Sequence, residues 1–77
     1  MLEYTKEQLK EVHRQAVMDL VNFAGGRTHL AKMLNKPLPT INSWVDRGVI
    51  SKQGVKAVCD NSALKDEFPV SRLRPEL

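Results

Sequence analysis

One stretch of the chain, residues 25–48, limits what this sequence can fold into more than any other. It reads GGRTHLAKMLNKPLPTINSWVDRG, and its apolar residues recur at helical spacing in two short runs. The spacing predicts one helix over residues 27–34 and a second over residues 38–47, with their apolar side chains facing a common core. The side chains on that inner face are Leu30, Ala31, Leu34, Ile41, Trp44 and Val45.

Four residues fix the turn between these helices and the end of the second one. Asn35 follows the first helix, where a left-handed backbone is needed, and Asn tolerates that conformation better than other residues with a side chain. Pro37 cannot continue the first helix, and Pro39 is tolerated because it falls in the first turn of the second. Gly48 is suited to end the second helix. Together these residues predict a helix-turn-helix.

The segments on either side predict further helices that pack on this unit. Thr5 and Gln8 have the spacing of a capping box ahead of a long apolar stripe, which predicts a helix that ends near Ala24. Ser51 is a second N-cap and predicts a helix over residues 52–60. Within that helix, Gly54 is expected to cost about 1 kcal/mol of stability relative to Ala.

The C-terminal tail, residues 63–77, leaves two structures open. Phe68 and Val70 alternate with polar residues, as in a short strand, whereas residues 71–75 fit one capped helical turn. The chain contains no internal repeat and no low-complexity linker. We therefore expect a mainly α fold, namely one compact helix-turn-helix domain over residues 1–77 with four to five helices and this tail.

Composition excludes several classes of protein. The chain has 77 residues, and none of its apolar runs reaches the roughly 20 residues of a transmembrane helix. Its first residues are charged and lack the apolar stretch of a signal peptide. Cys59 is the only cysteine, so it cannot form an internal disulfide and suits a reducing compartment. We expect a cytoplasmic protein that does not contact membranes.

The positive charge is concentrated on the helix-turn-helix. The net charge is +3, but residues 25–56 carry six basic side chains and one acidic side chain. The segments before and after them each carry one more acidic than basic side chain. This is where a protein that binds a nucleic-acid backbone needs its lysines and arginines.

Two stretches, AGGRTHLAKML…INSWVDRG and the closing LRPEL, resemble small phage and prophage regulators of the Cro family and the related YdaS-like proteins. Such proteins typically have a Gly-Gly-x-x-x-Leu-Ala opening, a Trp late in the second helix of the motif and a Leu-Arg-Pro-acid-Leu end. The matching residues are Gly25, Gly26, Leu30, Ala31, Trp44 and residues 73–77. The resemblance covers roughly residues 20–77.

The sequence departs from this family in two places. The turn reads Asn35-Lys36-Pro37 where the family usually has Gly, an apolar residue and Ser, so the second helix has no side-chain acceptor at its N-cap. The long first helix is also unusual. Family members differ in their C-terminal halves, since some are all-helical and others use a β-hairpin for dimerisation.

The resemblance implies a sequence-specific DNA-binding transcriptional regulator. In particular, it implies a prophage Cro-type repressor that binds double-stranded DNA at a pseudo-palindromic operator as a dimer. Such a helix-turn-helix presents the N-terminal half of its second helix to the major groove. The side chains expected to contact bases are Leu38, Pro39, Thr40, Asn42 and Ser43, and those expected to contact phosphates are Arg27, Lys36, Arg47 and Lys52.

A dimer is expected because one helix reads too few bases for useful specificity. Its interface must lie outside the helix-turn-helix, whose exposed face is committed to DNA. We expect it in the tail at Phe68, Val70 and Leu73, with Val55 and Val58 as the alternative. The homodimer is expected to be weak in free solution, because the tail offers few apolar side chains.

A protein-binding module is the alternative function. In this reading the chain is an antitoxin-like protein whose long first helix grips a toxin, or a repressor, and which autoregulates its operon. Catalysis has little support, because His13 and His29 lack a second metal ligand at helical spacing and Cys59 lacks a His or Cys partner. We therefore expect no enzyme activity, no metal and no cofactor.

Overall fold

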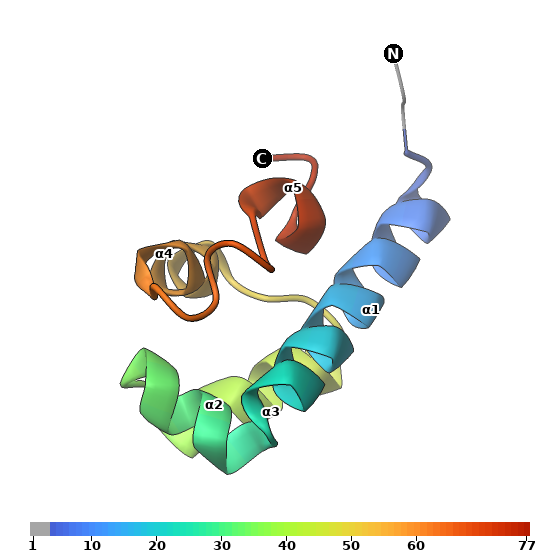
Figure 1. Ribbon diagram of the computed structural model, residues 1–77. Coiled ribbons are helices and arrows are strands. Elements are labelled where there is room, and N and C mark those ends of the chain that lie inside the picture. The colour runs from blue at the N-terminus through green and yellow to red at the C-terminus, as the bar shows by residue number, and fades with distance from the viewer. Residues whose placement is uncertain (1–3) are drawn as a thin grey trace.

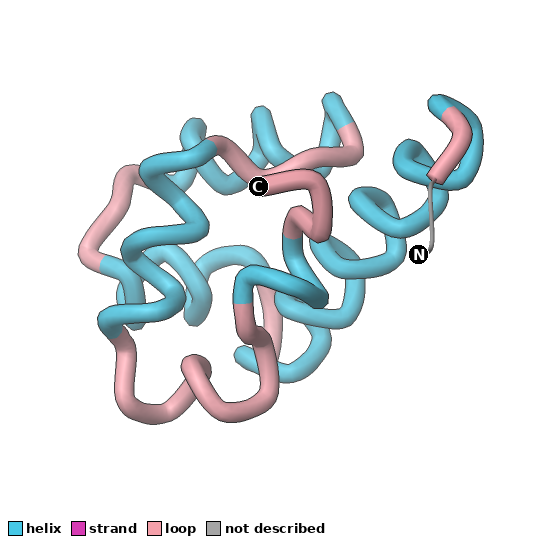
Figure 2. Tube along the Cα trace, turned by 90° about the horizontal axis from the view of Figure 1, so that it is seen from above, coloured by secondary structure: helices cyan, strands magenta, loops and turns pink. Residues whose placement is uncertain are grey.

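The computed structural model describes residues 4–77, which form helices joined by short loops (Figure 1). The helices are α1 (Lys6–Ala24), α2 (Arg27–Leu34), α3 (Leu38–Arg47), α4 (Lys52–Asp60) and α5 (Val70–Leu73). The mainly α fold is confirmed, and Figure 2 shows only helices and loops over the described chain. None of the described helices is both long enough and apolar enough to cross a membrane.

The capping and turn residues adopt the conformations that the sequence predicts. Thr5 and Gln8 close the capping box of α1, because each backbone N–H donates to the other side chain, at 2.9 and 3.1 Å. Asn35 has a left-handed backbone with φ 54° and ψ 45°, and Gly48 ends α3 in the same region with φ 71°. Pro37 offers α3 no side-chain cap, so the turn is set by backbone hydrogen bonds.

All the helices contribute to one hydrophobic core. α1 is the longest helix, and α2, α3 and α5 pack against it, while α4 packs against α5 (Figure 1). Trp44 is 4% exposed, which confirms its predicted place in the core. The other buried apolar residues are Ala16, Val17, Leu20, Val21, Leu30, Ala31, Leu34, Ile41, Ile50, Val55, Val58, Leu64, Phe68 and Leu73.

The tail contains one helical turn, and two of its large apolar side chains are part of the core. Of the two structures left open, the strand is wrong and a helical turn is right, but α5 covers Val70–Leu73 and no side chain caps it. Phe68 is 1% exposed and Leu73 is 0% exposed, so the prediction that they form the dimer interface is wrong. The physical reason is that so small a domain needs every large apolar side chain to fill its own core.

Two further contacts hold Phe68 in place. The ring of Phe23 on α1 meets it edge to face, with centroids 5.4 Å apart, and the Arg72 guanidinium lies 4.5 Å from its centroid.

Val55 and Val58, the alternative interface residues, are buried as well. Of the five residues expected at a dimer interface, only Val70 keeps a surface position, at 36% exposed.

Polar contacts fasten the end of the tail to α1 and to the loop before α4. His13 Nε2 lies 2.9 Å from Glu76 Oε1, and Arg74 Nη2 lies 2.9 Å from Glu76 Oε2. Arg74 Nη1 also donates to the carbonyl oxygen of Ile50 at 3.3 Å. Burial alone raises the pKa of Glu76, but hydrogen bonds from His13, from its own backbone and from Arg74 outweigh it and lower the pKa to about 2.

Gly54 has a packing role that its helix propensity does not reveal. A Cβ at this position would lie 2.5 Å from Cζ2 of Trp44 and 2.6 Å from Cγ1 of Ile50. The expectation that Gly54 only weakens α4 is therefore incomplete, because its missing side chain makes room for the indole. Trp44 on α3 and Gly54 on α4 together set the distance between these two helices.

We predict that Gly54→Ala destabilises the domain, although Ala is the better helix former. Overpacking costs about 1–3 kcal/mol and helix propensity returns roughly 1 kcal/mol, so a net loss of up to about 2 kcal/mol is expected in urea denaturation. The exposed Lys56→Ala on the same helix serves as the control and should change stability by less than about 0.5 kcal/mol. A more stable Gly54→Ala protein would contradict this packing.

We predict a loss of stability in acid that depends on Glu76. Its pKa is about 2 in the folded protein and 4.5 in the absence of the fold, so the unfolded chain binds the proton first as pH falls. This contribution is complete above pH 4.5 and declines as pH falls toward 2. Urea denaturation at several pH values should show a smaller decline for Glu76→Gln than for wild type, and parallel curves would count against the contact.

Candidate nucleic-acid interface

The outward face of α3 is accessible and carries polar side chains beside Leu38 and Pro39, whereas its inner face is buried. Ile41 is 0% exposed on the inner side. Leu38 is 39% exposed on the outer side, and Pro39 and Ser43 are exposed as well. Thr40 and Asn42 are half-buried at the two flanks. The side chains expected to contact bases therefore share an accessible surface, and base contact by each remains a prediction.

Asn42 is coupled to the start of α2. Arg27 Nη1 donates to Asn42 Oδ1 at 3.1 Å, across the space between the two helices. The amide group of Asn42 is thereby oriented with its NH₂ free of that bond. Arg27 also begins α2, where the first backbone N–H groups and the helix dipole attract anions. One side chain predicted to contact phosphate is thus tied to one predicted to contact a base.

Arg27 forms one basic edge of α3, and a second basic edge lies on the side of α3 that faces the start of α4. Here a hollow of about 480 Å³ separates the two helices, and no acidic side chain lines it. Arg47 and Lys52, both predicted phosphate contacts, meet in this hollow. The other polar side chains around it are Thr40, Ser43, Ser51, Gln53 and Arg74. α3 is therefore flanked by Arg27 on one side and by Arg47 and Lys52 on the other.

Lys36, the remaining predicted phosphate contact, lies at the turn. It lines a shallow hollow with Thr28 and Lys32 of α2 and with Leu38 at the start of α3. This puts Lys36 near the N-terminal end of α3, away from Arg47 at the C-terminal end. All four predicted phosphate contacts thus surround α3, although they belong to different elements.

The structure also brings in residues that the sequence reasoning missed. Lys10 and Arg14 of α1 lie beside Arg47 and Gly48 at the end of α3. Counting charge by segment hid them, because Lys10 and Arg14 fall in a segment with net negative charge. Their spacing of four residues, which puts both on one helix face, was the available signal.

One acidic residue lies on the outward face of α3. Asp46 is exposed, and it follows Asn42 by four residues and Ser43 by three, so all three share a face. A carboxylate here repels phosphate, but it can accept a hydrogen bond from the amino group of cytosine. Asp46 is therefore a further candidate for a base contact.

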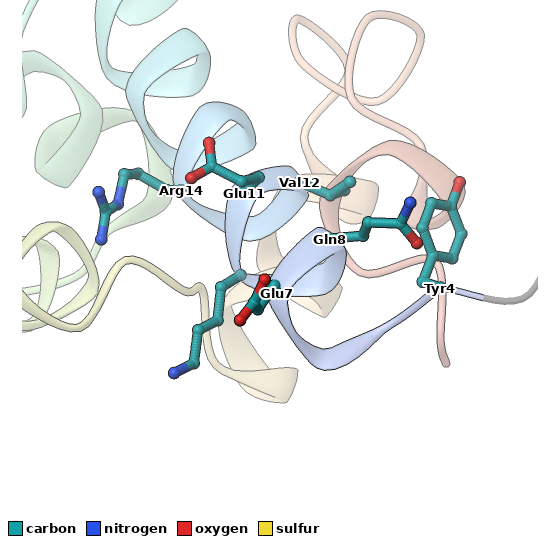
Figure 3. A pocket seen from close by; sticks show the side chains of 7 residues that line it. Tyr4, Glu7, Gln8, Glu11, Val12 and Arg14 are labelled. Carbon is teal, nitrogen blue, oxygen red and sulfur yellow. The ribbon is translucent and has the colours of Figure 1, made fainter.

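Other chemistry finds little support in the described residues. No group of three or more His, Cys, Asp or Glu side chains in residues 4–77 is arranged to hold a metal ion. A hollow of about 650 Å³ lies on the N-terminal half of α1, and Figure 3 shows the Tyr4, Glu7, Gln8 and Glu11 side chains around it. These side chains form no nucleophile–base pair, so the hollow does not indicate an active site.

Comparison with known proteins finds no matching family model, no matching curated protein and no matching solved structure. The assignment of a function therefore depends on the geometry and charge around α3.

Proposed function

We propose that this protein is a sequence-specific DNA-binding transcriptional regulator in which α3 enters the major groove. The observation that carries the proposal is the arrangement of charge around α3. Its outer face is accessible, and cations flank it on both sides, at Arg27 and at Arg47 with Lys52. A helix between two basic edges matches a groove between two phosphate backbones.

In this proposal the N-terminal half of α3 reads base edges. Asn42 hydrogen-bonds an adenine edge, and Ser43 bonds one of several bases. Leu38, Pro39 and the methyl group of Thr40 are suited to the methyl group of thymine. Arg27, Lys36, Arg47 and Lys52 bind phosphates, which fix the position of the protein on the duplex without reading sequence.

We further propose that the protein represses transcription as a homodimer on a pseudo-palindromic site in the cytoplasm. Two copies of α3 about 34 Å apart would read two half-sites on one face of the duplex. The interface must exclude Phe68 and Leu73, which are buried within the protomer. The remaining candidates are Val70 and Leu77 at the surface of the tail and the exposed side of α1.

A protein-binding role is the second candidate, and α1 is the observation that favours it. Tyr4, which precedes α1 and is 44% exposed, lies beside the hollow of about 650 Å³ on the N-terminal half of this helix (Figure 3). An antitoxin that grips its toxin through this helix would also bind its own operator. Co-purification of a stoichiometric toxin with the tagged protein would support this role, and it does not exclude the first.

The first test is the salt dependence of binding to a duplex selected from a random-sequence library. If about 4–6 phosphates are neutralised per protomer, the logarithm of the affinity should fall against the logarithm of the salt concentration with a slope of about −4 to −5 per protomer. Fluorescence anisotropy at several salt concentrations measures it. A slope near zero, or no duplex enriched by the selection, would refute the proposed function.

The second test separates base reading from phosphate binding at the Arg27–Asn42 pair. Asn42→Ala should lower the preference for the selected duplex over a variant changed at one adenine by about 5–100-fold, with the salt slope unchanged. Arg27→Ala should weaken binding to all duplexes and also lower this preference, because the Asn42 amide loses the partner that orients it. An unchanged preference in Arg27→Ala would mean that the contact has no role in recognition.

A further inference from the structure

Three basic side chains from two distant parts of the sequence converge at the C-terminal end of α3. Lys10 and Arg14 of α1 and Arg47 of α3 line one hollow of about 360 Å³, together with His13, Gly48 and Val49. Figure 3 shows the Arg14 side chain pointing away from Gln8 and Tyr4. Cβ and Nε of Arg14 lie 3.7 Å from the place where a Cβ on Gly48 would be. The side chain of Arg14 therefore lies against the end of α3.

These three cations lack an acidic partner in the described chain. The ion pairs of residues 4–77 are formed by His13, Arg72 and Arg74, and none includes Lys10, Arg14 or Arg47. His13 is the one lining residue with an acidic contact, since its Nε2 lies against Glu76. Lys10 and Arg14 also line the neighbouring hollow on α1 together with Glu7 and Glu11, but neither carboxylate forms an ion pair with them in the described residues.

The end of α3 offsets only part of this charge. A helix C-terminus is equivalent to about half a negative charge, and it acts only within its last turn. Three positive charges around one hollow therefore leave an excess that favours an anion. Since the hollow is open to solvent and has donors on two sides, it suits a group with several acceptor oxygens, as a phosphate has.

We propose that this hollow, lined by Lys10, Arg14 and Arg47, binds one phosphodiester group of the DNA backbone, beyond the bases that α3 reads. The proposal rests on the proposed function. Arg47 links the hollow to the basic edge formed with Lys52, so one backbone strand can follow α3 from the start of α4 to α1. The long first helix thus extends the contact with DNA.

The experiment compares Arg14→Gln and Lys10→Gln with the matched control Lys65→Gln, an exposed cation in the tail. The affinity of each full-length protein for the selected duplex is measured at several salt concentrations. Loss of one phosphate contact should make the salt slope shallower by about 0.9 per protomer and leave the preference between duplexes unchanged. Lys65→Gln, with the same change in charge, should keep the wild-type slope.

A second arm identifies the source of the phosphate group. Inorganic phosphate is titrated into labelled protein while the amide resonances around Gly48 are followed by NMR. If phosphate shifts these resonances in wild type and not in Arg14→Gln, while both proteins share one DNA slope, the hollow binds free phosphate and the backbone assignment is overturned. Shallower slopes in both variants support it, whether or not free phosphate binds.

The outcomes separate this subsite from the proposed function. If wild type binds duplex DNA and both variants keep its slope, the subsite is refuted and the proposed function stands. If wild type binds no duplex, both the subsite and the proposed function are refuted. Far-ultraviolet circular dichroism and thermal unfolding of each variant confirm that a change in slope reflects a lost contact and not a lost fold.

Discussion

The position of α3 depends on the close contact between Trp44 and Gly54. The indole of Trp44 occupies the space that a side chain at position 54 of α4 would fill. Ile50, in the loop between α3 and α4, is fully buried and lies against the same position. Because Trp44 lies on the inner face of α3, its burial fixes which side of that helix faces solvent. The accessibility of Pro39, Asn42 and Ser43 is therefore a consequence of core packing. The same packing sets the distance between Lys52 and α3.

The second constraint is the small size of the core. With few aromatic residues, the chain uses Phe68 and Leu73 of its last segment to close the core over α1 and α4. This leaves the tail little apolar surface for a partner, with Val70 and Leu77 as its large exposed apolar side chains. It also explains why Arg74 and Glu76 are tied to Ile50 and His13, since these bonds hold a short helical segment that cannot be stable by itself.

The sequence was sufficient for the first four helices, but it left the structure of the tail open and was insufficient for the contacts between the elements. Helix bounds followed from local signals such as Thr5, Asn35 and Gly48, whose conformations depend on a few neighbouring residues. Phe68 and Leu73 were misassigned because their burial depends on residues far away in the sequence, on α1 and α4. The same reason hid Lys10 and Arg14 beside Arg47, and the bond from Arg27 to Asn42. The local pattern placed the predicted DNA-contact side chains on α3 and around it. Only the fold shows which of these side chains contact one another.

The most direct measurement of the central claim is an NMR titration of the ¹⁵N-labelled protein with a duplex selected from a random-sequence library. The account predicts that the largest amide shifts map to α3 between Leu38 and Arg47, with further shifts at Arg27 and at Lys52. Mapping of the shifts to the outer side of α1 around Tyr4 and Glu11, with α3 unaffected, would contradict the claim that α3 is the helix that reads DNA.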